Sequence, residues 1–166
     1  MIEERVTQEA VHYRVYSTRW IQLIVYVLVS FANALPSMTF VPIISQTEKF
    51  YNITTTEVNI LPMLYLFLYV FGTILSILLS RKFSMRVIMI IGSILNIGVF
   101  IRLFSLIKPN QGYPALVIGQ ICISIAQPIF INVTALFAAR WFPPSQRDIA
   151  TAIGSMANPL GKILNK

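Results

Sequence analysis

Charged side chains are scarce in this chain: they make up 11% of its 166 residues, and only six of them are acidic. In soluble domains about a quarter of the residues are charged, so the low charged fraction of this chain excludes an ordinary soluble domain. Apolar side chains reach 56%, and charge-free runs cover residues 20–47, 58–80, 87–101, 109–139 and 149–161. Because a bilayer core of about 30 Å requires about 20 apolar residues of helix, these runs predict an integral membrane protein.

Cysteine and histidine are almost absent. Cys122 is the single cysteine, which excludes an intramolecular disulfide. His12 is the single histidine, so we expect no metal site. Every carboxylate lies in a tail or a loop, and the sequence contains no Ser-His-Asp set, Cys-His set or phosphate-binding glycine loop. We therefore expect neither an enzyme nor a bound cofactor. The six carboxylates are Glu3, Glu4, Glu9, Glu48, Glu57 and Asp148.

The apolar runs predict an all-α fold. We expect a polytopic membrane protein with four complete transmembrane helices, at about 20–44, 58–80, 86–107 and 113–139, and the start of a fifth at 149–164. The third helix reaches spanning length only if it continues past residue 101. The polar residues 1–19 form a tail before the first helix. The apolar run after this tail is too long to be the apolar part of a cleaved leader, so we expect the first helix to be retained.

Basic residues flank the spans asymmetrically. Eight Lys and Arg lie at one set of helix ends, whereas Lys49 and Lys108 lie in the two opposite loops. By the positive-inside rule, the tail is cytoplasmic and loops 45–57 and 108–113 face the other side; the plasma and endolysosomal membranes are not distinguished. Because the net charge of +7 comes from residues beside spans, we do not expect a nucleic acid partner. The eight are Arg5, Arg14, Arg19, Arg81, Lys82, Arg86, Arg140 and Arg147.

The outer loop contains "NIT" at residues 52–54, which makes Asn52 a candidate glycosylation acceptor. The alternative is structural: "TTTE" at residues 54–57 fits a capping box that opens the next helix. A second match, "NVT" at Asn132, falls inside a predicted span, where glycosylation cannot occur.

Two predicted helices carry polar stripes. At about 100° per residue, the polar side chains of helix 20–44 cover roughly a quarter of its circumference, and those of helix 113–139 do the same. Such residues either join helices by hydrogen bonds worth about 0.6 kcal/mol each or line a water-filled cavity. Their large side chains and the nearby Pro36, Pro42 and Pro128 favour the cavity. The stripes are Gln22, Tyr26, Ser30, Asn33 and Ser37, and Gln120, Ser124, Gln127 and Thr134. The predicted substrate cavity is Gln22, Asn33, Ser37, Gln120 and Gln127.

The other two complete helices look like packing helices. Gly72, Ser76 and Ser80 repeat every four residues, which favours close helix packing, with Tyr65 and Tyr69 on the same side. In helix 86–107 we expect Gly92, Ser93, Asn96 and Gly98 to serve mainly in packing. Arg102, the one charge inside a span, lies about 7.5 Å from the helix end, so we expect it to extend to the outer interface; a functional role is the alternative.

Two segments resemble the major facilitator superfamily. They are "LLSRKFSMRVI" (78–88) and "ARWFPPSQRDIATAIGSMANPLG" (139–161). Within them Arg81, Lys82, Arg86, Arg140 and Arg147 correspond to the cytoplasmic loop motif, although Arg81 replaces the family's acid and Ser84 its glycine. "YRVYSTRW", "NAL", "GQICISIAQ", "RWFPPSQR" and "SMANPLG" resemble solute carrier family 49, the feline leukaemia virus subgroup C receptor-related transporters, and the last two favour its domain-containing protein 7 branch.

This resemblance implies twelve helices in two lobes, of which the chain supplies part of the first. It implies a transporter of a small organic solute by alternating access, with an organic cation such as choline as one candidate. Choline-carrying relatives have a Trp where this chain has Ser37, whereas their helix-four Gln matches Gln127. We expect the lipid bilayer and the solute as partners. On this reading we expect the chain to be a truncated N-terminal part or isoform of the carrier. The alternative is a membrane subunit without transport activity that associates with the full-length carrier.

Overall fold

The computed structural model describes residues 16–37, 39–107 and 109–164, with the backbone alone for 109–111. The described part is mostly helical and contains no strand, which confirms the predicted all-α class. Four segments are long and apolar enough to cross a membrane: Arg19–Ser37, Thr55–Lys82, Met85–Phe104 and Gly112–Trp141. Of the predicted tail 1–19, residues 1–15 and His12 with them lie outside the described residues.

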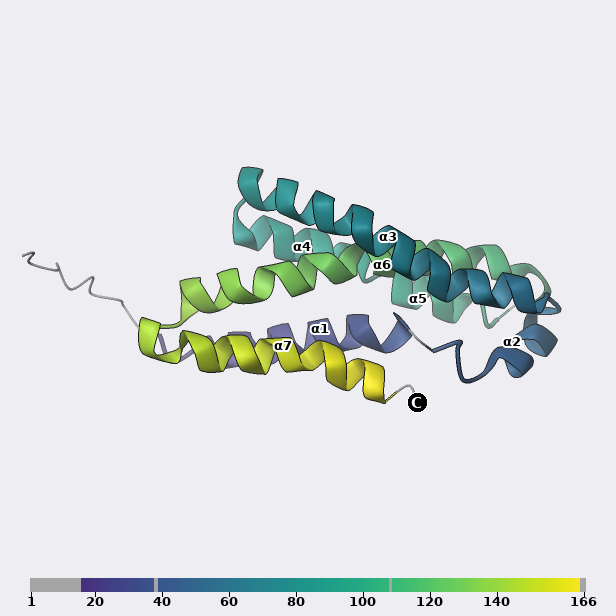
Figure 1. Ribbon diagram of the computed structural model, residues 1–166, viewed down its shortest axis with the longest axis horizontal. Coiled ribbons are helices and arrows are strands. Elements are labelled where there is room, and N and C mark those ends of the chain that lie inside the picture. Colours follow the sequence, from purple (N-terminus) through teal and green to yellow (C-terminus); the bar gives the residue numbers. More distant parts are fainter. Residues whose placement is uncertain (1–15, 38, 108, 165–166) are drawn as a thin grey trace, which may run out of the picture.

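The elements follow one another along the chain and form one bundle (Figure 1). Helix α6 is at the centre, since 61% of its apolar window is buried, against 17% for α3. Helices α3 and α4 lie on one side of α6, and α1 and α7 lie on the other (Figure 1). The elements are α1 (Arg19–Ala34), η1 (Leu35–Ser37), α2 (Ile44–Tyr51), α3 (Thr55–Lys82), α4 (Met85–Leu95), α5 (Gly98–Phe104), α6 (Pro109–Trp141), η2 (Pro144–Gln146) and α7 (Arg147–Ile163).

The first span is shorter than the predicted helix 20–44. Helix α1 ends at Ala34 and continues only as the 3₁₀ turn η1. Pro36 lies in this turn, and a proline has no N–H with which to continue the helical hydrogen bonds. The chain then forms α2, a separate helix inside the predicted outer loop, which ends at Asn52 in the left-handed conformation (φ 54°) that asparagine tolerates.

The third span is interrupted between α4 and α5. The N–H groups of Val99 and Phe100 bond to carbonyls three residues earlier, at Asn96 (3.0 Å) and Ile97 (2.9 Å), so the helix tightens locally. Just after this interruption, α5 approaches α6 very closely. A Cβ atom at Gly98 would lie 2.6 Å from the carbonyl oxygen of Gly119, which leaves no room for any side chain at either glycine.

Helix α3 begins and packs as the sequence predicts. Its first turn is a capping box: the Thr54 N–H donates to Glu57 Oε2 (2.8 Å) and the Glu57 N–H donates to Thr54 Oγ1 (3.4 Å). Gly72 lies directly against Pro128 of α6, where a Cβ atom would be 2.8 Å from the proline ring. Ser76 Oγ lies 3.5 Å from the Pro128 carbonyl oxygen. The small-residue face of α3 is therefore its contact with α6.

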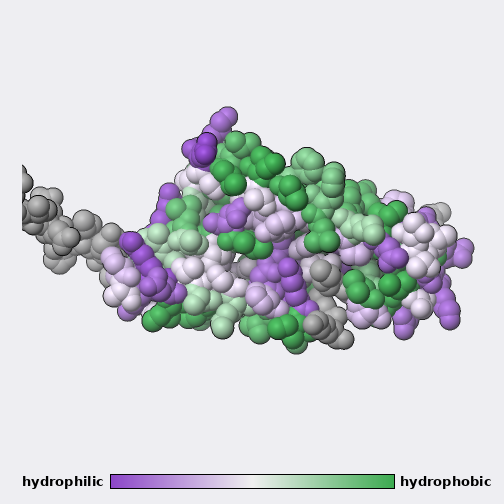
Figure 2. Space-filling model, in the orientation of Figure 1, coloured by the Kyte–Doolittle hydropathy of each residue, from purple (hydrophilic) through white to green (hydrophobic). Residues whose placement is uncertain are grey.

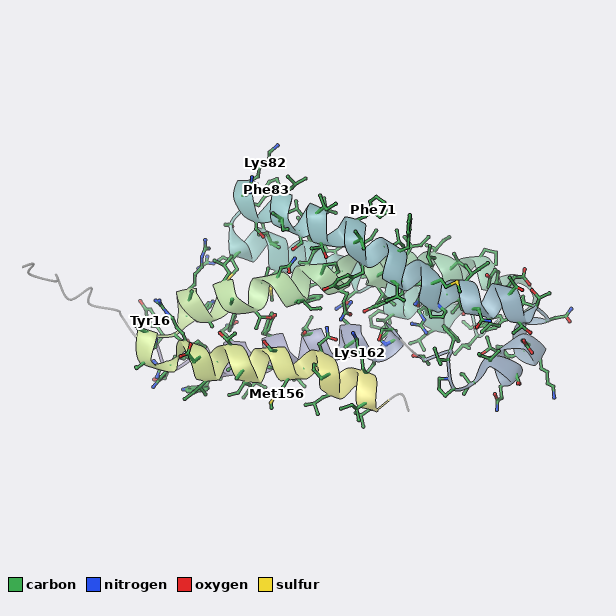
Figure 3. The ribbon with its side chains drawn as sticks, viewed as in Figure 1. Tyr16, Phe71, Lys82, Phe83, Met156 and Lys162 are labelled. Atoms are coloured by element: carbon green, nitrogen blue, oxygen red, sulfur yellow. The ribbon has the colours of Figure 1, made fainter. Side chains whose placement is uncertain are left out.

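The outside of the bundle exposes many large apolar side chains, and its mainly hydrophobic interior also encloses polar side chains such as Asn33, Gln120 and Gln127. Phe67 is 63% exposed and Phe71 54% exposed, and Figure 3 shows Phe71 pointing away from the bundle. Hydrophobic residues cover much of the upper and lower parts of the molecule, whereas hydrophilic residues gather at its two ends and in a patch in its middle (Figure 2). This distribution suits a protein surrounded by lipid, because polar groups there must find partners inside the protein.

Candidate functional site between α1 and α6

The two predicted polar stripes face each other in the structure. The Tyr26 hydroxyl of α1 donates to the Phe130 carbonyl of α6 and lies 2.5 Å from Thr134 Oγ1. One and two turns further along α1, Ser30 and Asn33 are also buried, and Asn33 Nδ2 lies 3.4 Å from the Ile123 carbonyl oxygen. The stripes therefore meet along most of α1, partly by direct hydrogen bonds.

The structure brings four of the five predicted cavity residues into the protein interior. Asn33, Ser37, Gln120 and Gln127 are each at most 2% exposed. Asn33 reaches Ile123, which lies about one turn from both glutamines on α6. Gln22 is instead exposed, because α1 turns this position away from α6. Gln22 and Ser30 lie about 80° apart around the axis of α1, as their spacing in the sequence predicts. Which of the two positions is buried depends on where α6 lies.

Several buried polar atoms of this interface have no hydrogen-bond partner within the described residues. They are Asn33 Oδ1, Gln120 Oε1 and both amide atoms of Gln127. The Gln120 Nε2 has a long contact with the Leu61 carbonyl oxygen at 3.4 Å. A buried polar group without a partner costs about 1–3 kcal/mol, so this arrangement is suited to binding water or a polar solute.

Asn96, at the interruption between α4 and α5, completes this group. Its Oδ1 accepts a 2.5 Å hydrogen bond from Asn33 Nδ2. The sequence predicted only a packing role for Asn96, since nothing in its neighbours indicates that the third span bends toward α1. We refer to Asn33, Asn96, Gln120 and Gln127 as the central polar cluster.

The outer side of the cluster is closed by α3 and η1. The Ser37 hydroxyl donates to the Ala34 carbonyl at the end of α1 (2.7 Å), so it already has a local acceptor. The Tyr65 hydroxyl of α3 interacts with Ser37 but makes no hydrogen bond of normal geometry. Tyr65 is 2% exposed. A buried tyrosine of α3 thus lies next to Ser37 of η1.

A small cavity of about 220 Å³ lies between α1, α6 and α7, beside the Tyr26 contact. Ser30 and Thr134 from the predicted stripes line it, together with Ser155 and Asn158 from α7. The two α7 residues were not predicted, although their spacing of three places them on one helix face. Gly154 lets α7 approach, because a Cβ atom there would be 2.8 Å from Thr134 Cγ2.

Tyr26 is the residue that ties the two stripes together, and Tyr26→Phe should measure that contact. We expect a loss of about 1 kcal/mol in the free energy of unfolding, because the Phe130 carbonyl and the Thr134 hydroxyl lose a buried partner. Thermal unfolding in detergent, followed by tryptophan fluorescence, provides the measurement. Tyr16→Phe, at an exposed tyrosine, is the control. Equal unfolding temperatures for the two variants would show that the hydroxyl contributes nothing.

Arg102 does not extend to the outer interface as predicted. It is 8% exposed, its Nη1 donates to the Pro36 carbonyl (2.8 Å), and its guanidinium lies 4.7 Å from the centre of the Phe40 ring. The missing side chain of Gly119 makes room for it, since a Cβ atom there would be 2.6 Å from Arg102 Cγ. The side chain therefore crosses from α5 to η1 inside the protein.

The residues of the basic loop motif gather at one end of the bundle, where Figure 3 labels Lys82 and Tyr16. Arg81 and Lys82 end α3, Arg86 begins α4, and Arg140 lies in the last turn of α6. Arg147 begins α7 and its Nε donates to the Phe142 carbonyl (3.2 Å). The assignment of this end to the cytoplasm stays a prediction, and so does glycosylation of the exposed Asn52 at the other end.

In residues 16–37, 39–107 and 109–164, no group of three His, Cys, Asp or Glu side chains that could hold a metal ion gathers. The chemistry that this interface offers is hydrogen bonding by amides and hydroxyls, together with aromatic rings. Such groups can bind and orient a polar solute by hydrogen bonds.

Comparison with known proteins agrees with this architecture. Residues 23–164 match the family model of the Major Facilitator Superfamily. The chain is 34% identical over 160 residues to solute carrier family 49 member A3 of Xenopus tropicalis, covering 92% of this chain and 33% of the relative. It is 30% identical to the member A3 of Danio rerio (95% of this chain, 34% of the relative) and 28% identical to the choline/ethanolamine transporter FLVCR2 of Homo sapiens (89% and 28%).

The chain thus spans about a third of the length of the curated relatives it matches. The resemblance to solute carrier family 49 that the sequence motifs indicated is confirmed by these similarities. With the helical bundle, its four apolar spans and a family match over most of its length, the chain belongs to the major facilitator superfamily of membrane transporters.

Proposed function

We propose that this chain acts as part of a two-lobed carrier that moves a small polar organic solute by alternating access, and that the central polar cluster is its share of the solute site. The observation that carries the proposal is the set of buried amide atoms without partners: Asn33 Oδ1, Gln120 Oε1 and both Gln127 atoms. Alternating access places the solute between two lobes near the middle of the membrane. A share of the site formed by α1 and α6 fits that requirement.

The balance of donors and acceptors in the cluster favours a solute rich in N–H and O–H groups. Asn33 and Gln120 donate their amide N–H groups to carbonyl oxygens, which fixes their free oxygens as acceptors. With the Gln127 oxygen, the fully buried atoms of the cluster that lack a partner are three acceptor oxygens and one amide nitrogen, Gln127 Nε2. FLVCR2 is named a choline/ethanolamine transporter. Of these two solutes, ethanolamine has both ammonium N–H groups and a hydroxyl, whereas the quaternary nitrogen of choline has no N–H to donate.

Uptake measurements test this proposal. In cells that express the two-lobed carrier containing this segment, we expect the pair Asn33→Ala and Gln127→Ala to lower uptake of labelled ethanolamine about tenfold or more, since about 1.4 kcal/mol of lost binding is tenfold. Gln22→Ala is the matched control, because Gln22 is an exposed glutamine on the same helix as Asn33. Surface expression of each variant is measured in parallel.

Unchanged uptake of both ethanolamine and choline by the double variant, at normal surface expression, would contradict the proposal. The alternative from the sequence, a subunit without transport activity that associates with a full-length carrier, stays a prediction; in that case the cluster substitutions would leave association with the carrier unaltered.

A further inference from the structure

A second cavity lies away from the central polar cluster, at the end of the bundle that holds α2. Its volume is about 560 Å³, within the range of small-molecule sites. It is bounded by η1 and the segment after it, by α2, and by α5, with Leu116 of α6 at its base. The walls are mostly apolar, and they include Phe40, Phe50 and Leu103.

Two hydrogen bonds hold the walls of this outer cavity in place. The Tyr51 hydroxyl of α2 lies 2.7 Å from Ser105 Oγ, just after α5, and both residues are at most 5% exposed. Arg102 of α5 donates to the Pro36 carbonyl of η1. The cavity is therefore a built feature between three elements rather than a gap between loosely placed helices.

Arg102 is the only ionisable cation that lines the outer cavity within the part of the chain that the structure describes. Among the same lining residues there is no Asp or Glu, and no ion pair is formed to Arg102. A cation in an apolar site is costly unless an anion accompanies it. The carbonyl of Pro36 and the ring of Phe40 compensate the charge only in part, since neither carries a full negative charge.

The geometry of the guanidinium leaves room for such an anion. Its Nη1 is engaged by the Pro36 carbonyl. Its Nε and Nη2 make no hydrogen bond to the described residues, and they are not among the side-chain nitrogens enclosed without a partner. These two N–H groups are therefore accessible from the cavity that Arg102 lines. Arginine presents such an edge to a carboxylate as two parallel hydrogen bonds.

From these observations we infer that the outer cavity is a binding site for an amphipathic monocarboxylate, a molecule of the fatty-acid type. Its carboxylate pairs with the free edge of Arg102, and its apolar chain lies against Phe40, Phe50 and Leu103. One uncompensated cation matches one negative charge, and the apolar walls match a hydrocarbon chain. The site is separate from the central polar cluster and does not depend on the proposed transport function.

Photolabelling tests this site on the chain itself. The chain is placed in nanodiscs of phosphatidylcholine and labelled with a palmitate that carries a diazirine in its chain, and the labelled peptides are identified by mass spectrometry. We expect labelling of peptides from α2 and α5, competition by unlabelled oleate, and labelling at least tenfold weaker by the corresponding alcohol, which lacks the charge. We expect Arg102→Met to lower labelling by the acid about tenfold and to leave labelling by the alcohol unaltered.

The control for charge is Arg81→Met, which removes an exposed arginine at the other end of the bundle. If Arg102→Met fails to give a monodisperse protein, Val99→Phe decides instead, because Val99 lines the cavity and the larger side chain fills it while Arg102 remains. Loss of labelling in Val99→Phe supports the site, and labelling at the wild-type level contradicts it.

Three results would overturn the inference: equal labelling by the acid and the alcohol, undiminished labelling of a well-folded Arg102→Met, or labels outside the cavity peptides. Displacement of the probe by phosphatidylglycerol added to the nanodiscs, but not by oleate, would also overturn it, because the occupant would then be an anionic phospholipid. None of these results bears on ethanolamine uptake, so the two proposals fail separately.

Discussion

Replacing Gly119 by leucine is expected to remove most of the stability of this chain. A Cβ atom at Gly119 would already lie 2.6 Å from both Arg102 Cγ and the Gly98 carbonyl oxygen, and one of these two contacts is backbone, which cannot move aside. Forcing extra atoms into a packed interior costs about 1–3 kcal/mol for small additions. Displacing Arg102 from the Pro36 carbonyl adds the cost of a buried charge that has lost its partner, about 3–5 kcal/mol.

Together these terms are comparable to the whole free energy of unfolding of a typical domain, about 5–15 kcal/mol. The measurement is the fraction of monodisperse protein after heating in detergent, followed by size-exclusion chromatography. Ser93→Leu is the matched control, because it adds a leucine to the neighbouring helix α4 at an exposed position. A Gly119→Leu variant that survives heating as well as Ser93→Leu would show that α5 and α6 do not pack as closely as described.

Replacing Gln127 by leucine is expected to act in the opposite direction on stability. Both amide atoms of Gln127 are buried without a hydrogen-bond partner among the described residues. An apolar side chain of similar size removes that penalty of about 1–3 kcal/mol. For a chain of this length, each kcal/mol corresponds to roughly 2–4 °C in the unfolding temperature. We therefore expect Gln127→Leu to unfold roughly 2–12 °C above the wild type, and solute uptake by the carrier to be lost.

Such a variant would separate the effect of the central polar cluster on stability from its proposed part in solute binding, because a residue kept for binding can lower the stability of the fold. Gln22→Leu is the control, since Gln22 is exposed and its replacement removes no buried unpaired group. Thermal unfolding of both variants in the same detergent gives the comparison. A lower unfolding temperature for Gln127→Leu than for the wild type would mean that the amide is satisfied in the folded protein and that this argument for a solute site is wrong.

What the sequence predicted well follows from local rules. The spans were predictable because a long apolar run has few alternatives to a membrane helix. The capping box of Thr54 and Glu57 was predictable because it joins residues three apart. The facing stripes of α1 and α6 were predictable because a polar side chain within a span must turn away from lipid.

Other features required the packing of helices that are distant in the sequence. Asn96 joins Asn33 across 63 residues, and Arg102 reaches Pro36 across 66, so no local pattern could assign either contact. Gln22 shares a stripe with Asn33 but is exposed, because helix direction alone does not say which part of a stripe a neighbour covers. Ser155 and Asn158 enter the cavity beside α1 only because Gly154 lets α7 approach.

The sequence by itself determined that this chain is a bundle of membrane helices with two polar stripes, since hydrocarbon penalises every polar group that has no partner. Only the tertiary structure decided which polar groups meet, which amides stay unpaired, and that the Arg102 side chain points inward and lines the outer cavity. The physical reason is that these outcomes depend on contacts shorter than 4 Å between different helices. Close approaches between helices, such as that of Gly98 to Gly119, determine which side chains come into contact.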